Sequence, residues 1–294
     1  MFPLYDAHCH YHDAWLAPHR ARVFADLAAV GVRRAVVNGT CETDWPDVAA
    51  LAKEFPIVAP SYGLHPWDVG NRSPDWEKRL LTALDSHPSP SSHPSHSPGA
   101  LGEIGLDRWI LDRARPDDPR LAGLRRAPLA EQTEVFLRQL DLAAARNLPA
   151  SIHCLDAFGP LLDALRGARL PARGFLLHAY SGSAESAKSF ADLGAYFSFN
   201  GAFLEPRQQR LRDLYAALPA DRVLVETDAP AMRLPPSHEK FPPLPTDDGA
   251  LANHPANIAT TYAALAEARG IPLVSLARQI ETNFLRFFGN ANPR

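Results

Sequence analysis

Eight short apolar runs, each followed by a segment with apolar residues at helical spacing, constrain the fold of this chain more than any other feature. Runs rich in Val, Ile, Leu and Phe throughout predict strands buried on both faces, which is typical of parallel sheets covered by helices. Segments such as 23–31 and 131–147 predict those covering helices. Eight strand–helix repeats predict a TIM-type (β/α)8 barrel, folded as a single domain over residues 1–294. The runs are residues 3–10, 33–40, 56–65, 99–107, 149–154, 174–180, 194–203 and 222–230.

A doubly wound open sheet is the alternative α/β architecture for such a repeat. In dinucleotide-binding members of that class a GxGxxG motif follows the first strand, and no such motif follows residues 3–10. The barrel is therefore the favoured prediction.

Two segments interrupt the repeat. Residues 85–99 are Ser, Pro or His at 13 of 15 positions, which predicts a disordered surface insertion that contributes nothing to a core. Its histidines are not expected to bind a metal, because a flexible tract does not hold ligands in a fixed geometry. Residues 107–128 predict a longer loop, containing Arg and Pro, on the face where barrel enzymes place their active sites.

Composition and charge narrow the class of protein. No apolar run approaches the roughly 18 residues of a membrane span. The net charge of −3 excludes a global basic field for nucleic-acid binding, so a polyanionic substrate has to be attracted locally. The three cysteines include no CxxC pair and fit a reducing compartment. We therefore expect a cytoplasmic protein that contacts no membrane and needs no obligate protein partner.

Residues able to bind a metal stand at the ends of several predicted strands. His8 and His10 point to the same side of the first strand, because strand side chains alternate between faces. Glu103 lies in an apolar run flanked by glycine, where a carboxylate needs an arginine or a metal as partner. The fifth and sixth strands end in His153 and His178.

The eighth predicted strand adds Glu226 and Asp228, which alternation turns to one side, so one of them should reach the barrel mouth. Four histidines and two carboxylates at one end of a barrel favour a metal site over the alternative of buried, hydrogen-bonded histidines. Mixed ligation of this kind suits Zn²⁺, Mn²⁺, Fe²⁺ or Co²⁺. Six ligands exceed what one catalytic ion uses, which favours two ions and a metal-activated water.

Covalent catalysis has little support in the sequence. The chain contains no GxSxG motif. Cys154 follows His153 on a strand and so points to the opposite face, where it is expected to pack as a small apolar residue.

In order along the chain, the motifs DAHCH, GLHPW, GEIGLD, SIHC, HAYSGS, ETDAP and ETNFLRFF resemble those of the TatD family of metal-dependent hydrolases, within the amidohydrolase-like TIM barrels. The resemblance implies two divalent ions, sometimes three, of Zn, Mn or Mg, and hydrolysis of phosphodiester bonds in DNA. It also implies that Glu103 bridges the ions and that Asp228 acts as a catalytic base for the attacking water. The implied metal ligands are His8, His10, Glu103, His153, His178 and Asp228.

Substrate contacts are less directly indicated. By resemblance, His65 of GLHPW lies beside the substrate and contacts phosphate, the alternative being a structural role before Pro66. The family usually has an arginine where this chain has Leu155, which removes one phosphate contact. Tyr180 in HAYSGS adds a hydroxyl that either binds substrate or packs.

The loop at 107–128 offers a replacement for the missing arginine. Arg108 and Arg113 are predicted to contact substrate phosphates, the alternative being a solvated loop whose arginines pair with its own aspartates. These differences from the family lie beside the predicted metal ligands and leave them intact. They affect only the choice of substrate.

Two enzyme functions follow from these residues. The leading hypothesis is a metal-dependent phosphodiesterase or deoxyribonuclease, and the alternative is a hydrolase of a small-molecule amide, ester or lactone bond on the same barrel. A carboxylated-lysine bridge is excluded, because no lysine occurs between Lys78 and Lys188. A non-catalytic binding protein is disfavoured, because such a barrel would be expected to have lost ligands.

Overall fold

A computed structural model describes residues 2–86 and 99–289. Its main sheet contains eight strands in the order β1 to β8, and each strand pairs in parallel with the next. The strands are β1 (Leu4–Cys9), β2 (Val32–Asn38), β3 (Val58–Tyr62), β4 (Ala100–Asp107), β5 (Ala150–Leu155), β6 (Phe175–Leu177), β7 (Ala195–Asn200) and β8 (Val223–Glu226).

The sheet closes where the segment after β8 meets β1. The backbone N–H of Asp228 donates to the His8 carbonyl over 3.0 Å, and that of His10 donates to the Ala229 carbonyl over 2.8 Å. The predicted TIM-type barrel is confirmed, because eight parallel strands close in sequence order with helices between them.

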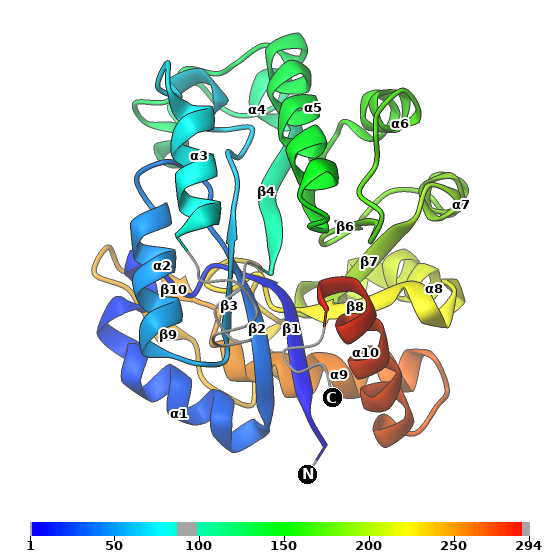
Figure 1. Cartoon of the computed structure of the whole chain (residues 1–294). Helices are drawn as coiled ribbons and strands as arrows, with labels where there is room; N and C mark the ends of the chain where they lie inside the picture. The colour runs from blue at the N-terminus through cyan, green and yellow to red at the C-terminus, as the bar shows by residue number, and fades with distance from the viewer. Residues whose placement is uncertain (1, 87–98, 290–294) are drawn as a thin grey trace.

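Helices surround the strands (Figure 1). Helix α1 ends before Gly31, which adopts the left-handed conformation with φ of 92° and lets the chain turn into β2. The helices are α1 (Arg20–Val30), α2 (Trp45–Glu54), α3 (Trp76–Asp85), α4 (Trp109–Asp112), α5 (Leu129–Ala145), α6 (Phe158–Arg166), α7 (Ala184–Asp192), α8 (Gln209–Ala217), α9 (Ile258–Ala268) and α10 (Leu273–Phe288). Within the described residues, no helix combines the length and apolarity needed to cross a membrane.

The last helix fills the N-terminal end of the barrel. Phe284, Phe287 and Phe288 of α10 join a buried cluster with side chains from seven of the eight strands. The ring of Phe284 lies 4.8 Å from that of Tyr5 in β1, and Phe287 lies 4.6 Å from Tyr196 in β7. The C-terminal ETNFLRFF motif therefore has a structural role, closing the N-terminal end of the barrel. An active site can lie only at the opposite end.

Both predicted insertions differ from expectation, the first in its boundaries and the second in its secondary structure. The first begins later than residue 85, because Asp85 belongs to α3 and pairs with Arg146 over 2.6 Å. Gly99, at its other end, donates its N–H to the Pro60 carbonyl over 2.7 Å. The remainder of that insertion, residues 87–98, lies outside the described residues. The second, 107–128, contains α4 and a 3-10 turn, η4 (Pro119–Leu121), rather than an irregular loop alone.

Candidate metal centre

The Glu103 carboxylate lies between two pairs of histidines at the C-terminal end of the barrel. Its Oε2 is 3.4 Å from His8 Nε2 and 3.3 Å from His10 Nε2. Its Oε1 is 3.1 Å from His153 Nδ1 and 2.9 Å from His178 Nε2. One carboxylate thus faces two separate groups of ring nitrogens, as a bridging ligand between two ions would.

Asp228 completes the first group. Its Oδ1 lies 3.3 Å from His10 Nε2 and 3.7 Å from His8 Nε2. Because β8 ends at Glu226, strand alternation does not orient Asp228; the backbone there is left-handed, with φ of 50°. Glu226 is instead fully buried, accepts hydrogen bonds from Ser198 and Asn200, and lies 3.7 Å from His178 Nδ1. Of the two carboxylates, Asp228 is the one that reaches the mouth.

The spacing of these atoms fits divalent ions. Ligand bonds of about 2.0–2.2 Å to zinc place neighbouring ligand atoms roughly 3–3.5 Å apart around a tetrahedral or octahedral ion. The donor atoms named above are separated by 2.9–3.7 Å. Among the described residues, each of the three groups of possible ligand side chains contains His8 or Glu103; one joins His8 with His178 through Glu103, and one adds His65 to Glu103 and His153.

The far sides of two of the histidine rings are also held as metal ligation requires. His10 Nδ1 lies 2.8 Å from the Asn38 carbonyl, and His153 Nε2 lies 3.2 Å from the Asp107 carboxylate. A carbonyl or carboxylate oxygen only accepts, so these nitrogens carry the protons. In the neutral rings, which ligation requires, His10 Nε2 and His153 Nδ1 direct lone pairs into the cluster, and the residues present fit a two-ion centre.

The charges of the cluster favour bound cations. Burial alone would lower the pKa of His10 and His178, but hydrogen bonds and charges from the carboxylates raise both pKa values well above the usual range. Burial alone would raise the pKa of Glu103, but the surrounding histidines hold it well below its usual range. Glu103 is thus ionised although only 3 % exposed, and the site attracts positive charge.

Asp107 supports the centre and was missed in the sequence. It is fully buried, and its Oδ2 faces His153 Nε2 while accepting a 2.6 Å hydrogen bond from Trp67 Nε1. The argument applied to Glu103 would have found it, since Asp107 closes the same buried GEIGLD run. Ser151 was missed as well: its Oγ lies 2.8 Å from His8 Nδ1, and strand alternation places it on the same face of β5 as His153.

Glycine allows β4 to approach β5 closely beside Glu103. Gly105 has a φ of 147°, and a Cβ there would lie 2.0 Å from the His153 carbonyl oxygen. Gly105 pairs with His153 in the sheet register. A side chain at this position would push apart the two strands that carry Glu103 and His153.

A sequence profile described as TatD related DNase matches residues 5–289, nearly the whole chain. The chain belongs to the TatD family. It is 29% identical over 283 residues to the uncharacterized metal-dependent hydrolase YjjV of Escherichia coli K12, with 96% of each chain covered. It is 27% identical over 287 residues to the 3'-5' ssDNA/RNA exonuclease TatD of Escherichia fergusonii, covering 97% of this chain and 99% of that one.

Solved structures of the TatD family agree with this assignment. The crystal structure of E. coli YjjV superposes with a TM-score of 0.80 at 28% identity, covering 98% of both chains. A TatD family hydrolase from Entamoeba histolytica shares the fold, with a TM-score of 0.77 at 16% identity and 98% of both chains covered. This chain is therefore a metal-dependent hydrolase of the TatD type.

His65 lies closer to the TatD-type centre than its motif alone indicated. It is 8 % exposed, and its Nε2 is 3.6 Å from Glu103 Oε1. Its Nδ1 accepts the backbone N–H of Trp67 over 3.2 Å, so the proton of the neutral ring is on Nε2. Burial lowers the pKa of His65 to about 3, which keeps the ring neutral. His65 is thus placed as a hydrogen-bond donor facing the centre.

Tyr180 does not face the mouth of the barrel. Its side chain is 1 % exposed, and its hydroxyl donates to the Ser183 carbonyl over 2.9 Å. Its ring packs against Phe158 and Phe197. This position favours the packing alternative over the substrate contact, because the Tyr180 hydroxyl is buried and donates to a carbonyl inside the protein.

Arg108 and Arg113 are exposed and paired with aspartates. Arg108 Nε lies 2.8 Å from Asp112, as the solvated-loop alternative predicts. Arg113 Nε lies 3.3 Å from Asp156, which is outside the 107–128 segment. Their side chains are 52% and 69% exposed, so either could exchange its partner for another anion. A role in substrate binding stays a prediction.

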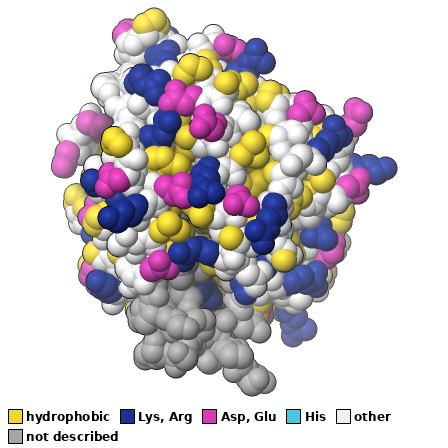
Figure 2. Space-filling model, turned by 45° about the horizontal axis from the view of Figure 1, so that its top comes forward, with side chains coloured by type: hydrophobic (Ala, Val, Ile, Leu, Met, Phe, Trp, Pro, Cys, Tyr) yellow, Lys and Arg dark blue, Asp and Glu magenta, His cyan; other side chains and the backbone are white. Residues whose placement is uncertain are grey.

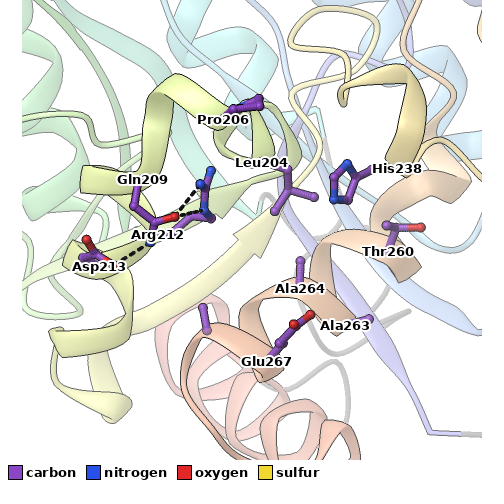
Figure 3. A pocket seen from close by; sticks show the side chains of 11 residues that line it. Leu204, Pro206, Gln209, Arg212, Asp213, His238, Thr260, Ala263, Ala264 and Glu267 are labelled. Atoms are coloured by element: carbon purple, nitrogen blue, oxygen red, sulfur yellow. Dashed lines mark hydrogen bonds between the residues drawn. The ribbon is translucent and has the colours of Figure 1, made fainter.

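The pocket in Figure 3 is a different site from this centre. It is a cavity of about 540 Å³ between α8, α9 and the 3-10 turns η6 (Pro206–Gln208) and η8 (Pro236–His238). Gln209 there bonds to both Arg212 and Asp213. None of the predicted metal ligands lines it.

Proposed function

We propose that this protein is a phosphodiesterase that hydrolyses single-stranded DNA or RNA, using two divalent ions held by six side chains at the barrel mouth. The observation that carries the proposal is the position of Glu103, whose two oxygens face separate histidine pairs at 2.9–3.4 Å. Relatives named as 3'-5' ssDNA/RNA exonucleases support the choice of substrate.

Nitrogen and carboxylate donors favour Zn²⁺ or Mn²⁺ over Mg²⁺, which prefers oxygen ligands. His8, His10 and Asp228 would hold one ion, His153 and His178 the other, with Glu103 shared between them. Bound ions would polarise a water molecule and neutralise the charge of the phosphoryl group.

The side chains around the centre have separate tasks. The hydrogen bond from His10 and nearby histidine charges lower the pKa of Asp228 although burial would raise it, so Asp228 is ionised. Asp228 lies at the mouth, where its carboxylate can orient the attacking water and accept its proton. His65 Nε2 donates a hydrogen bond to a non-bridging phosphate oxygen.

The surface supplies no general attraction for a polyanion. Lys and Arg side chains are mixed with Asp and Glu on the face shown in Figure 2, and the net charge is −3. Binding therefore depends on the centre and on its immediate rim. All three cysteines are free, which suits the reducing cytoplasm that we propose as the location of the protein.

The test combines metal analysis with turnover. Purified protein would be stripped with a chelator, reloaded with Zn²⁺, Mn²⁺ or Mg²⁺, and assayed on end-labelled single-stranded DNA and RNA and on neutral esters and lactones. We expect about two ions per chain and stepwise shortening of the oligonucleotides. Glu103→Gln should lower both metal content and activity, whereas Glu77→Gln, which alters a surface pair with Arg138, should change neither. Fully loaded protein that is inert toward nucleic acid but cleaves a neutral ester would refute the proposal.

A further inference from the structure

Two tryptophans and an arginine form an aromatic surface beside the metal centre. The rings of Trp67 and Trp109 lie nearly parallel, with centroids 6.1 Å apart and an angle of 22° between planes. The guanidinium carbon of Arg120 lies 4.8 Å from the centroid of Trp109 and 5.8 Å from that of Trp67. Both tryptophans are partly exposed, so part of this surface faces solvent.

This surface, which we call the Trp67–Trp109–Arg120 wall, is joined to the centre through one side chain. Trp67 Nε1 donates over 2.6 Å to Asp107 Oδ2, the oxygen that faces His153 Nε2 at 3.2 Å. The ring of His65 meets that of Trp67 edge-on, with centroids 5.7 Å apart. One side chain, that of Asp107, therefore lies between the wall and the predicted metal ligand His153.

Hydrogen bonds hold the wall in place. Arg120 makes two bonds to the Asp118 carboxylate, of 3.0 Å and 2.7 Å. The Arg126 guanidinium donates to the carbonyls of Ile110 and Ala114 over 3.1 Å and 3.2 Å, which ties the chain around α4 together. The aromatic faces are thus positioned before a substrate arrives, which reduces the entropy cost of binding.

The chemistry of the wall matches a nucleobase. Aromatic rings and guanidinium planes stack on the flat faces of bases, and this interaction is sequence-tolerant because every base has such a face. In a nucleotide, one sugar separates the phosphate from its base. In the protein, one carboxylate, that of Asp107, separates the centre from Trp67.

Resting on the proposed phosphodiesterase function, we propose that the Trp67–Trp109–Arg120 wall stacks on the nucleobase next to the scissile phosphate. Stacking supplies affinity that does not depend on charge. It therefore suits a chain that carries a net charge of −3. The wall makes the substrate a nucleotide chain rather than a phosphodiester of any kind.

The test compares two non-cleavable ligands that differ only in the base, dAMP and 2-deoxyribose 5-phosphate, by calorimetry on metal-loaded protein. Wild type should bind dAMP about tenfold more tightly than the sugar phosphate, within the range typical of base–aromatic stacking. Trp109→Leu should remove most of this preference and change affinity for the sugar phosphate less than about twofold. Trp109→Phe should keep most of the preference, because it keeps an aromatic face.

Arg120→Ala should weaken dAMP binding, whereas the matched control Arg115→Ala should not. Arg115 stands in the same segment, is paired with Asp117 in the same way, and has a 79% exposed side chain. Equal affinity of wild type for the two ligands, or a loss in Trp109→Leu that is the same for both, would overturn the wall's proposed role. If wild type fails to cleave any oligonucleotide, the phosphodiesterase proposal fails, and the dAMP preference still decides whether the wall binds a base.

Discussion

Replacing Asp107 with asparagine should weaken metal binding although Asp107 is not among the candidate metal ligands. The carboxylate accepts from Trp67 Nε1 and His153 Nε2 through Oδ2, and from the Ile110 backbone N–H through Oδ1 at 3.0 Å. An asparagine side chain keeps the shape but replaces one oxygen by an NH₂ group, which donates. In either orientation, that NH₂ group faces a donor that the carboxylate accepted.

The magnitude follows from these contacts. If the NH₂ group faces His153, the ring loses the acceptor that keeps its proton on Nε2 and its Nδ1 lone pair toward Glu103. Loss of such a supporting contact typically costs 10- to 100-fold in metal affinity. That range corresponds to about 1.4–2.7 kcal/mol. The reverse orientation leaves the Ile110 N–H without its acceptor at the start of α4 and lowers the stability of the fold instead.

The assay is a competition titration of stripped protein against a chromophoric chelator. We expect one of the two metal sites in Asp107→Asn to weaken by at least about tenfold, while the site formed by His8 and His10 changes little. The control is Asp117→Asn, an exposed aspartate of the same segment that pairs with Arg115. Unchanged affinity at both sites, with an unchanged melting temperature, would show that Asp107 does not orient His153.

Gly105→Ala should abolish metal binding, because its Cβ would lie 2.0 Å from a backbone oxygen of β5, whereas Gly123→Ala, which also has positive φ but nothing within 4 Å, should retain it; metal analysis distinguishes them. Replacing Arg108 and Arg113 with alanine should raise KM for DNA and flatten its salt dependence at constant metal content, and an unchanged salt slope would exclude both from phosphate binding. Burial, with the charge of a nearby aspartate, raises the pKa of Asp68 to about 7 from an ordinary 3.8, so the folded state holds this proton more tightly and stability falls as pH rises between these values. Asp68→Asn should therefore melt above wild type at pH 8 and level with it below pH 4, and a constant difference across this range would contradict the assignment.

The architecture and the members of the cluster could be predicted from the sequence. Apolar runs alternating with amphipathic segments specify βα units, and a parallel barrel brings the carboxyl ends of all its strands to one mouth. His8, His10, Glu103, His153 and His178 lie in or directly after strands, so local pattern and topology together were enough to gather them. That these five side chains lie close together could be predicted without knowing how the loops are folded.

Contacts between loops were decided only by the tertiary structure. Asp228 follows the end of β8, where a left-handed residue rather than strand alternation sets its direction. Tyr180 carries a hydroxyl for which the sequence allowed either a substrate contact or packing, and the structure shows it donating a hydrogen bond to the carbonyl of Ser183. The hydrogen bond from Trp67 to Asp107 joins residues 40 positions apart. Sequence periodicity reports which face of a local element is apolar, whereas these contacts depend on how separate elements pack, which no local pattern encodes.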